Sequence, residues 1–319
     1  MSELFSRIQE ASASVYPQVA VTALERSALL SSELGCEVLL KYEHMQPTGS
    51  FKIRGATNKV RLLDPQQRRT GVLTASTGNH GMAVARAGAL AGVPVKVFVS
   101  SITAPTKLAG IRAFGAELVI VDGPPLEAEL TARRTAEADG LTYISPYNDL
   151  DVVAGQGTLG VELFEQEPAL DAVFISVGCG GLIGGVGSAL KALNPRVQVV
   201  GVWPEASPCL LRALEAGKIF PVEERATLSD GTAGAVEPDS VTFPICQQVI
   251  DERVSVSESE IAAAMSHLAE TEHLMVEGAA GVALAGLAKR ASAYRGRKVA
   301  VVLCGRNIAP RAFAAIVDS

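Results

Sequence analysis

The sequence predicts an α/β protein built on mostly parallel sheets, and two observations support this. Short runs rich in valine and isoleucine alternate with longer alanine-rich stretches of helical periodicity. Hydrophobic residues make up 48% of the 319 residues and charged residues 19%, which is typical of a folded chain with a large core. At roughly 150 residues per domain, this length allows about two domains.

The predicted elements follow one another in alternation along the chain. The strands are expected at residues 38–42, 71–75, 95–99, 118–121, 172–177, 197–202 and 299–303. The helices are expected at residues 79–91, 106–114, 126–138, 207–216, 257–272 and 278–293. A further helix is expected directly after Ser50, whose hydroxyl can cap its first turn.

No flexible tether or internal repeat divides the chain. We therefore expect a second domain to be inserted into the first rather than joined to its end. The small domain is predicted at residues 71–146 and the large domain at residues 1–70 and 147–319. Polar clusters at 122–125 and 145–151 are interpreted as ordinary turns.

Charge and cysteine usage exclude several classes of protein. The 28 Lys and Arg against 34 Asp and Glu give a net charge of −6, which argues against nucleic-acid binding. No apolar run reaches the roughly 18 residues of a membrane span, and the first residues lack a secretory pattern, so a cytoplasmic location is expected. Five scattered cysteines without a C-x-x-C pair predict free thiols. Neither these nor the four histidines indicate a metal site.

The segment at residues 48–56 contains the first candidate for chemistry, Lys52. A cation in the first turn of a helix is disfavoured by the helix dipole, and Phe51 and Ile53 are apolar neighbours. Such a lysine can have a lowered pKa and form Schiff bases with carbonyl compounds. Taken alone, a lysine near a helix start is usually an ordinary solvated residue.

The second candidate is Ser-Thr-Gly-Asn-His-Gly at residues 76–81, between a predicted strand and a predicted helix. Backbone N–H groups at a helix start receive anions, so this turn predicts a carboxylate site, with the Asn79 amide free to bind an oxygen. A simple capped turn is the alternative.

Two further candidates follow predicted strands. The glycine-rich stretch at residues 178–185 matches neither the Walker nor the dinucleotide pattern, so a monophosphate cofactor fits it better. Close packing of glycine is the alternative. Cys304 follows the last strand, at the edge where open α/β sheets bind ligands, although it could simply be a buried apolar residue.

The order of these four segments resembles the fold type II pyridoxal-phosphate (PLP) enzymes, and within them the threonine/serine dehydratase and serine racemase family. The resemblance runs from residue 38 to the C-terminus and includes the stretches at 153–158, 229–231 and 277–281. It implies two open, twisted, mostly parallel sheets flanked by helices, with the small domain inserted in the large one. It also implies PLP as cofactor, an amino-acid substrate and a homodimer.

The resemblance assigns roles to individual residues. Lys52 would be the catalytic base and would carry the cofactor as a Schiff base, while Asn79 would bind the cofactor 3′-oxygen and Cys304 would face the pyridine nitrogen. The other cofactor-binding residues would be Phe51, Gly178, Cys179, Gly180, Gly181, Leu182 and Gly231. The substrate carboxylate would be held by Ser76, Thr77, Gly78, Asn79 and His80.

The chain departs from the family pattern in four places. Cys179 interrupts a run that is often all glycine, and Arg306 replaces a glycine after the last strand. Trp203 and Cys209 stand where some relatives have acidic metal ligands, so no metal site is expected. Thr77 stands where racemases have the serine that acts as a second catalytic base.

The resemblance implies a PLP-dependent carbon–oxygen lyase, a dehydratase that converts a 3-hydroxy amino acid to a 2-oxo acid and ammonia. The substrate would be threonine or serine. The stretches at 76–81, 230–234 and 304–307 also look like the subgroup of hydroxyectoine degradation, for which it would be a larger hydroxylated diamino acid derivative. An amino-acid racemase is one alternative, and a non-catalytic sensor of nucleotide phosphate is another, which would not need Lys52.

Overall fold

Residues 2–76, 78–103 and 105–318 are described by the structure, a computed structural model. The helices and 3-10 turns in this part of the chain are α1 Ser2–Val15, α2 Ala28–Leu34, η1 Glu43–Met45, α3 Lys52–Arg61, α4 Pro65–Thr70, α5 Asn79–Ala91, α6 Pro105–Ala113, α7 Pro125–Asp139, α8 Leu150–Gln166, α9 Gly181–Leu193, α10 Cys209–Ala216, α11 Thr242–Val249, α12 Glu258–Glu272, α13 Gly278–Arg290, η2 Ala291–Tyr294 and α14 Pro310–Val317. The strands are β1 Leu24–Arg26, β2 Glu37–Lys41, β3 Val72–Ala75, β4 Val95–Ser100, β5 Glu117–Val121, β6 Thr142–Tyr143, β7 Ala172–Ser176, β8 Gln198–Pro204, β9 Glu252–Val256 and β10 Lys298–Val302.

The strands form two separate sheets. One has the order β1-β2-β10-β7-β8-β9 and the other β5-β4-β3-β6. Among the described strands every pairing is parallel except the one between β1 and β2. The α/β prediction is therefore confirmed. The sequence prediction missed β1, β6 and β9, which are short or lie at a sheet edge.

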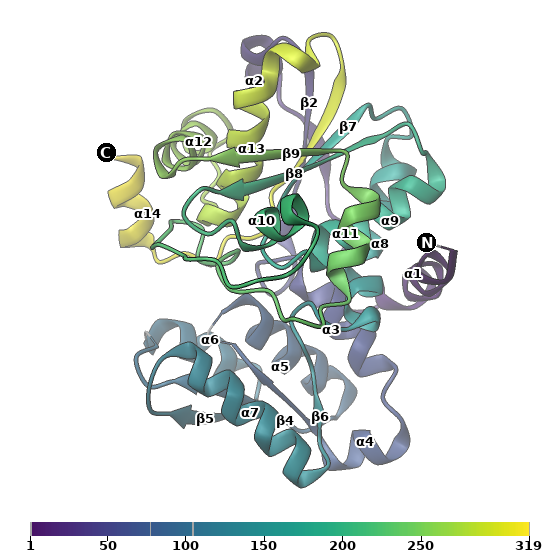
Figure 1. The fold of residues 1–319 in the computed structure, drawn as a ribbon, viewed down its shortest axis with the longest axis vertical. Coiled ribbons are helices and arrows are strands. Elements are labelled where there is room, and N and C mark those ends of the chain that lie inside the picture. The colour runs from purple at the N-terminus through teal and green to yellow at the C-terminus, as the bar shows by residue number, and fades with distance from the viewer. Residues whose placement is uncertain (1, 77, 104, 319) are drawn as a thin grey trace.

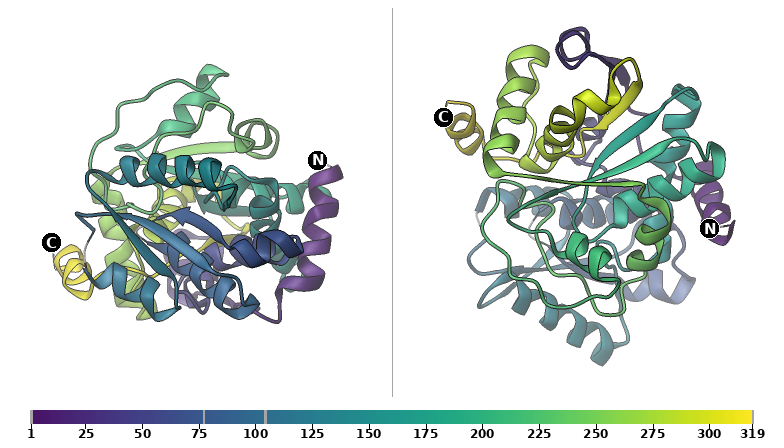
Figure 2. Two further views of the ribbon diagram at one scale, coloured as in Figure 1. Left: turned by 90° about the horizontal axis from the view of Figure 1, so that it is seen from below. Right: turned by 45° about the horizontal axis from the view of Figure 1, so that its top comes forward.

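Figure 1 shows the two sheets in separate halves of the molecule. We call the four-stranded sheet with α4 to α7 the small-sheet unit, and the six-stranded sheet with its helices the large-sheet unit. Whether residues 71–146 form a domain of their own stays a prediction. The two ends of the described chain lie on opposite sides of the molecule in all three views (Figures 1 and 2).

The sheet order determines which loops meet. In the large sheet β2, β10 and β7 are neighbours, and in a parallel sheet their carboxyl ends share one edge. Cys304 follows β10 and the glycine-rich turn follows β7, so both lie at this edge. The chain reaches α3 from the same end of β2, which brings Lys52 there too. The 76–81 turn follows β3 of the small sheet.

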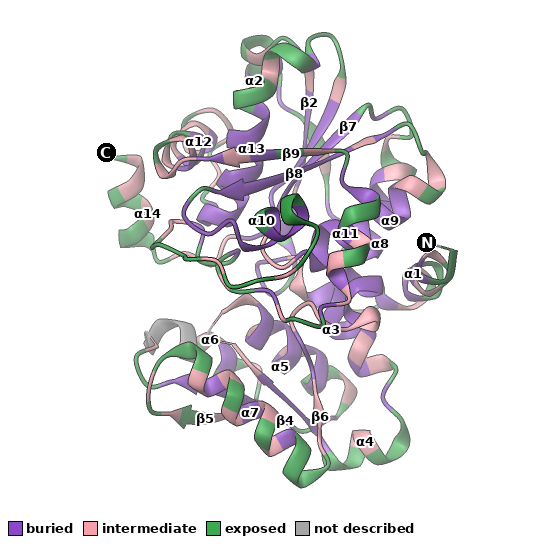
Figure 3. Cartoon of the chain, viewed as in Figure 1, coloured by how far each residue is buried: buried purple, intermediate pink, exposed green. Residues whose placement is uncertain are grey.

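Helix α3, which begins at Lys52, is held by very close helix packing. A Cβ atom added at Gly155 of α8 would lie 2.6 Å from the Arg54 carbonyl oxygen, so a larger residue would push α3 away. In the same way, a Cβ at Gly185 of α9 would lie 2.4 Å from the Val153 carbonyl of α8. These glycines let α3, α8 and α9 form one tightly packed layer, drawn mostly as buried in Figure 3.

None of the helices in the described residues combines the length and the apolar character needed to cross a membrane.

Candidate active site

Lys52 is the first residue of α3 and is half-buried. Its Nζ donates a hydrogen bond of 2.9 Å to the Pro146 carbonyl and lies 5.2 Å from the centre of the Phe51 ring. Burial lowers the pKa of Lys52 to about 8, against the opposing influence of Cys179, Cys304 and Glu277. A large fraction of the amine is therefore neutral, and so nucleophilic, slightly above neutral pH.

The start of α3 differs from the prediction. Phe51, not Ser50, occupies the cap position, and no side chain caps the helix. Ser50 instead forms a bridge with Gly305, and the Phe51 N–H donates to the Cys304 carbonyl at 3.1 Å. The predicted Ser50 cap is thus wrong, because pairing with the segment after β10 draws the chain away from cap geometry. This pairing brings Lys52 beside Cys304.

The glycine-rich turn forms the N-terminus of α9. Gly180 has a φ of +89°, which favours glycine, and the first backbone bond of the helix runs from Gly184 N–H to the Gly180 carbonyl. The N–H groups before Gly184 are therefore available to an anion, and the helix dipole adds to their attraction.

The flanking residues of this turn are tightly placed. A Cβ at Gly178 would lie 2.7 Å from the Thr232 carbonyl, and one at Gly181 would lie 3.1 Å from Tyr147 Cβ. The Cys179 thiol is turned toward the Gly234 and Ala235 carbonyls, at 3.7 and 3.5 Å. Burial raises the pKa of this thiol to about 12, so it stays neutral. Leu182, also assigned to the cofactor, is buried in the core.

Cys304 is fully enclosed at the end of β10. The Ser176 hydroxyl lies 3.5 Å from its Sγ. Burial, with a smaller contribution from Glu277, raises the pKa of the Cys304 thiol to about 12. The group predicted to face the cofactor ring nitrogen is therefore a neutral thiol.

The turn between β3 and α5 is placed as the sequence suggests, although Thr77 lies outside the described residues. The Ser76 hydroxyl accepts a 3.2 Å bond from the Gly78 N–H. The Asn79–Gly81 N–H groups stand in the first turn of α5, whose first backbone bond comes from Met82. A Cβ at Gly78 would meet open space, so a ligand can approach this backbone.

The His80 ring is turned away from this role. Its Nε2 is 3.0 Å from the Ile144 carbonyl, so Nε2 carries the proton in the neutral ring. Burial and then the Lys52 charge lower the pKa of His80 to about 3, which keeps the ring neutral at every ordinary pH. Any contact of His80 with a carboxylate would be through its backbone.

Glu277 is a buried acid at this site to which the sequence analysis gave no role. Asn79 Nδ2 donates to both of its carboxylate oxygens, at 2.8 and 3.1 Å, and the Asn307 N–H donates to Oε2 at 3.0 Å. Asn307 Nδ2 in turn donates to Asn79 Oδ1 at 2.5 Å. Glu277 and Asn307 therefore fix the orientation of the Asn79 amide. A Cβ at Gly231 would lie 3.4 Å from Glu277 Oε1, which brings Gly231 into the same group.

Pro146 and Tyr147 were also missed, because residues 145–151 were interpreted as an ordinary turn. The Pro146 carbonyl binds Lys52 and the Tyr147 side chain borders the turn before α9. Their signal was a cluster of turn residues ahead of the stretch at 153–158 that belongs to the family resemblance. The sequence does not show which distant residues such a cluster will contact.

Three of the departures from the family pattern, Trp203, Cys209 and Arg306, lie within the described residues and differ in their surroundings. Trp203 is fully buried on β8 and Cys209 is buried at the start of α10. The Arg306 side chain extends toward Met45, with Nη1 2.9 Å from Sδ. Within the described residues, no group of three or more His, Cys, Asp or Glu could hold a metal.

Arg54, two residues after Lys52 on α3, is the centre of a network of four buried charges that also includes Lys41 of β2, Glu43 of η1 and Glu162 of α8. Arg54 pairs with Glu43 through Nε and Nη2, at 2.7 and 2.8 Å, and with Glu162 at 2.9 Å. Lys41 Nζ lies 2.5 Å from Glu162. Arg54 also donates to the Thr158 hydroxyl at 3.1 Å. All four charged side chains are at most 2% exposed, and their charges sum to zero.

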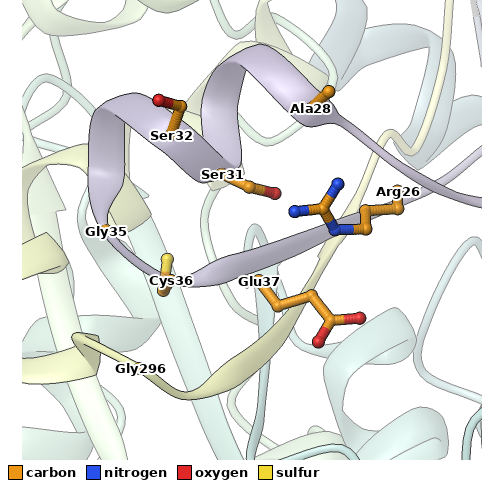
Figure 4. A pocket seen from close by; sticks show the side chains of 8 residues that line it. All are labelled: Arg26, Ala28, Ser31, Ser32, Gly35, Cys36, Glu37 and Gly296. Atoms are coloured by element: carbon orange, nitrogen blue, oxygen red, sulfur yellow. The ribbon is translucent and has the colours of Figure 1, made fainter.

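A cavity of about 340 Å³ lies elsewhere, at the start of β2. Arg26, Ser31 and Glu37 are among the side chains around it (Figure 4). None of the predicted site residues lines it, so it is separate from the group around Lys52.

The residues at the large-sheet edge fit a PLP cofactor. Lys52 offers an amine of lowered pKa for a covalent bond to the aldehyde. The turn before α9 offers the backbone N–H groups ahead of Gly184, which have no partner within the helix and are of the kind that binds a phosphate. The neutral Cys304 thiol is a polar group of a kind suited to a ring nitrogen, whereas the Asn79 amide, predicted for the 3′-oxygen, is bound to Glu277 and Asn307 in this structure.

Comparison with known proteins agrees with this fit. The family model described as "Pyridoxal-phosphate dependent enzyme" matches residues 15–305. The chain is 40% identical over 301 residues to the L-threonine ammonia-lyase of Thermotoga maritima, which covers 94% of this chain and 75% of the relative.

Two solved structures are similar over nearly the whole chain. The processed form of threonine deaminase isoform 2 from Solanum lycopersicum has a TM-score of 0.95 at 33% identity, covering 99% of this chain and 93% of that one. Maize serine racemase has a TM-score of 0.92 at 30% identity, covering 98% and 95%. The chain therefore belongs to the family of pyridoxal-phosphate dependent enzymes, with the fold type II architecture and PLP as its cofactor.

Proposed function

We propose that the chain is a PLP-dependent dehydratase that converts a 3-hydroxy amino acid of the threonine or serine type to a 2-oxo acid and ammonia. The observation that supports it most directly is the half-buried Lys52 amine, 2.9 Å from the Pro146 carbonyl and beside the N-terminus of α9. The named L-threonine ammonia-lyase of Thermotoga maritima supports the same reaction class.

When bound, PLP supplies an electron sink for charge that develops at the substrate Cα. Lys52 would hold the cofactor through its Nζ, and the same Nζ, when free and neutral, would take the α-proton as general base. The backbone N–H groups at the start of α5 receive the substrate carboxylate, which orients the Cα–H bond toward Lys52. Loss of the β-hydroxyl together with the α-proton removes one molecule of water and leaves an unsaturated amino acid. Hydrolysis of this released compound takes up one molecule of water and gives the 2-oxo acid and ammonia.

The neutral Cys304 thiol favours elimination over racemisation. A thiol that stays protonated would bring no negative charge to the ring nitrogen that it is predicted to face, so the cofactor would stabilise charge at the substrate Cα only weakly. Loss of the β-hydroxyl then competes well against return of a proton from the opposite face. Thr77, which stands where racemases have the serine that acts as a second catalytic base, has a β-branch that limits its rotamers.

The test is a panel of 3-hydroxy amino acids given to the purified holoenzyme, starting with threonine and serine and including a hydroxylated diamino acid of the hydroxyectoine type. We expect 2-oxo acid and ammonia in equal amounts, with little inversion of the residual substrate on chiral chromatography. If the opposite enantiomer accumulates faster than ammonia, the chain is a racemase. Lys52→Ala is the control for background reaction.

We also propose a homodimer in the cytoplasm. The five cysteines, all free in the structure, are consistent with a reducing compartment. Light scattering of the purified holoenzyme tests the dimer, and a monomer at micromolar concentration would exclude it. Fractionation of the source cells tests the location.

A further inference from the structure

Residues 218–241 join α10 to α11 without forming a helix or strand. Connections of this length without regular structure are uncommon and usually functional. This segment covers the turn before α9: the Thr232 carbonyl lies against Gly178, and the Ala235 carbonyl lies 3.5 Å from the Cys179 thiol. In Figure 1 it runs along the side of the large-sheet unit that faces the small-sheet unit.

Glu237 is the point at which this segment is tied to other parts of the molecule. Asn148 Nδ2 donates to Glu237 Oε2 at 3.0 Å, and the Glu237 N–H donates to the Tyr147 hydroxyl at 3.0 Å. Arg133 Nη2 lies 2.8 Å from Glu237 Oε1, in an ion pair without the alignment of a hydrogen bond. Because Arg133 belongs to α7, this pair joins the two sheet units.

Arg133 is held ready for this contact by its own unit. It also pairs with Glu129 one turn earlier on α7, at 2.9 Å, and its guanidinium lies 4.5 Å from the centre of the Tyr143 ring. The two partners of the pair are partly exposed, with 35% of the Arg133 and 21% of the Glu237 side chain accessible. Dissolved salt will therefore screen the attraction.

The contacts of Glu237 connect it to residues of the predicted active site. Tyr147, which receives its N–H, borders Gly181, and the neighbouring Pro146 carbonyl binds Lys52. The turn predicted to receive the substrate carboxylate belongs to the small-sheet unit, whereas Lys52 and the glycine-rich turn before α9 adjoin the large sheet. A tie between the units therefore affects the distance between the carboxylate site and Lys52.

We propose that Glu237 is a positioning residue: its pairing with Arg133 holds the small-sheet unit, and with it the carboxylate site, at the working distance from Lys52. The activity part of this inference rests on the proposed dehydratase function. Loss of a partly exposed pair corresponds to a change of about two- to fivefold in an equilibrium. The pair changes the fraction of molecules in the arrangement that binds substrate and does not touch the reacting atoms. The change therefore belongs in KM rather than in kcat.

The experiment compares Glu237→Gln and Arg133→Gln with Arg134→Gln in the holoenzyme. Arg134 is the matched control, since it is the next residue of α7, is 65% exposed and pairs within its own helix with Glu127 at 2.7 Å. We expect the first two variants to raise KM about two- to fivefold with little change in kcat, and the control to match the wild type. Adding salt should raise KM of the wild type and of the control only.

The double variant should be no worse than either single one, since both remove the same pair. Equal KM values in all forms, or an equal rise in the control, would overturn the proposal. Hydrogen exchange of the amides at 236–241 gives a readout independent of turnover. Faster exchange in the two charge variants alone supports the tie even if no substrate in the panel reacts, whereas faster exchange without a KM change in an active enzyme reduces Glu237 to a structural role and refutes it.

Discussion

Replacing Arg54 with methionine tests the network of four buried charges around it. The change keeps an unbranched side chain of similar length but removes the one group that pairs with both Glu43 and Glu162. Lys41 still pairs with Glu162, so Glu43 is left with hydrogen bonds from Thr22 and Gln46 and without its cation. A neutral set of four charges becomes a set of three with one uncompensated negative charge.

The cost follows from the burial of all partners. Removing one member of a buried ion pair typically destabilises a protein by about 3–5 kcal/mol, because the remaining charge has no water to solvate it. At about 2–4 °C per kcal/mol for a chain of more than 150 residues, Arg54→Met should melt roughly 6–20 °C below the wild type. Since Arg54 lies in the third position of the helix that begins at Lys52, cofactor loading should weaken as well.

The pH dependence separates charge from packing. In the wild type, burial alone would raise the pKa of Glu43, but the Arg54 charge and hydrogen bonds lower it below its usual value. Its contribution to stability is therefore present above about pH 4.5 and lost as pH falls through the lower folded pKa. Without Arg54 the pKa of Glu43 should rise above the unfolded value, so protonation of Glu43 at lower pH removes the uncompensated buried charge. The difference in melting temperature between variant and wild type should therefore be smaller at pH 5.5 than at pH 7.5.

The assay is thermal unfolding of the apo and holo proteins at both pH values, with Arg61→Met as control. Arg61 lies in the last turn of α3 and its side chain donates a 3.1 Å hydrogen bond to Asn58, in place of a buried ion pair, so its loss should cost less than about 1 kcal/mol. The reasoning is refuted if Arg54→Met melts within a few degrees of Arg61→Met at pH 7.5. If the difference in melting temperature between Arg54→Met and the wild type does not change with pH, then lost packing, and not the buried charge, causes the destabilisation.

Three further predictions concern the site itself. Lys52→Ala should lose the absorbance of the covalently held cofactor and all turnover while keeping its circular dichroism spectrum; retained absorbance would remove Lys52 from its role. Covalent loading of apo protein should accelerate with pH around a midpoint near 8, because burial lowers the pKa of Lys52 to about 8 and only the neutral amine reacts; a midpoint near that of an exposed lysine contradicts this. Activity should survive exhaustive chelation, since Trp203 and Cys209 offer no oxygen ligand; loss reversed only by Mg²⁺ or Ca²⁺ would refute it, unless the cation proved to bind at a different site.

The fold and the main chemical residues could be predicted because their signals are local. Lys52, the turn before α9 and Cys304 each directly follow a strand or begin a helix, and parallel strands necessarily bring such positions to one edge. The missed strands have weaker local signals. β9 reads Glu-Arg-Val-Ser-Val, an edge strand with polar residues on its outer face, and β6 has only two residues.

The contacts around these residues could not be predicted in the same way. Glu277 meets Asn79 across 198 positions of sequence, and Lys52 meets Pro146 across 94. Ser50 has a side chain that commonly caps helices, but it forms a β-bridge with Gly305 instead, because pairing between distant segments outweighed a local preference. Local patterns specify what a residue can do, whereas the folded chain decides which partner it has.

Trp203 gives the protein an internal optical reporter. It is the only tryptophan of the chain, is fully buried on β8, and lies on the strand beside β7, which leads into the glycine-rich turn before α9. Its fluorescence should be that of an indole shielded from water, and bound PLP should quench it by energy transfer. Because Trp203 belongs to the large sheet, its emission can follow cofactor loading and the unfolding of that sheet independently of the small-sheet unit, which has no tryptophan.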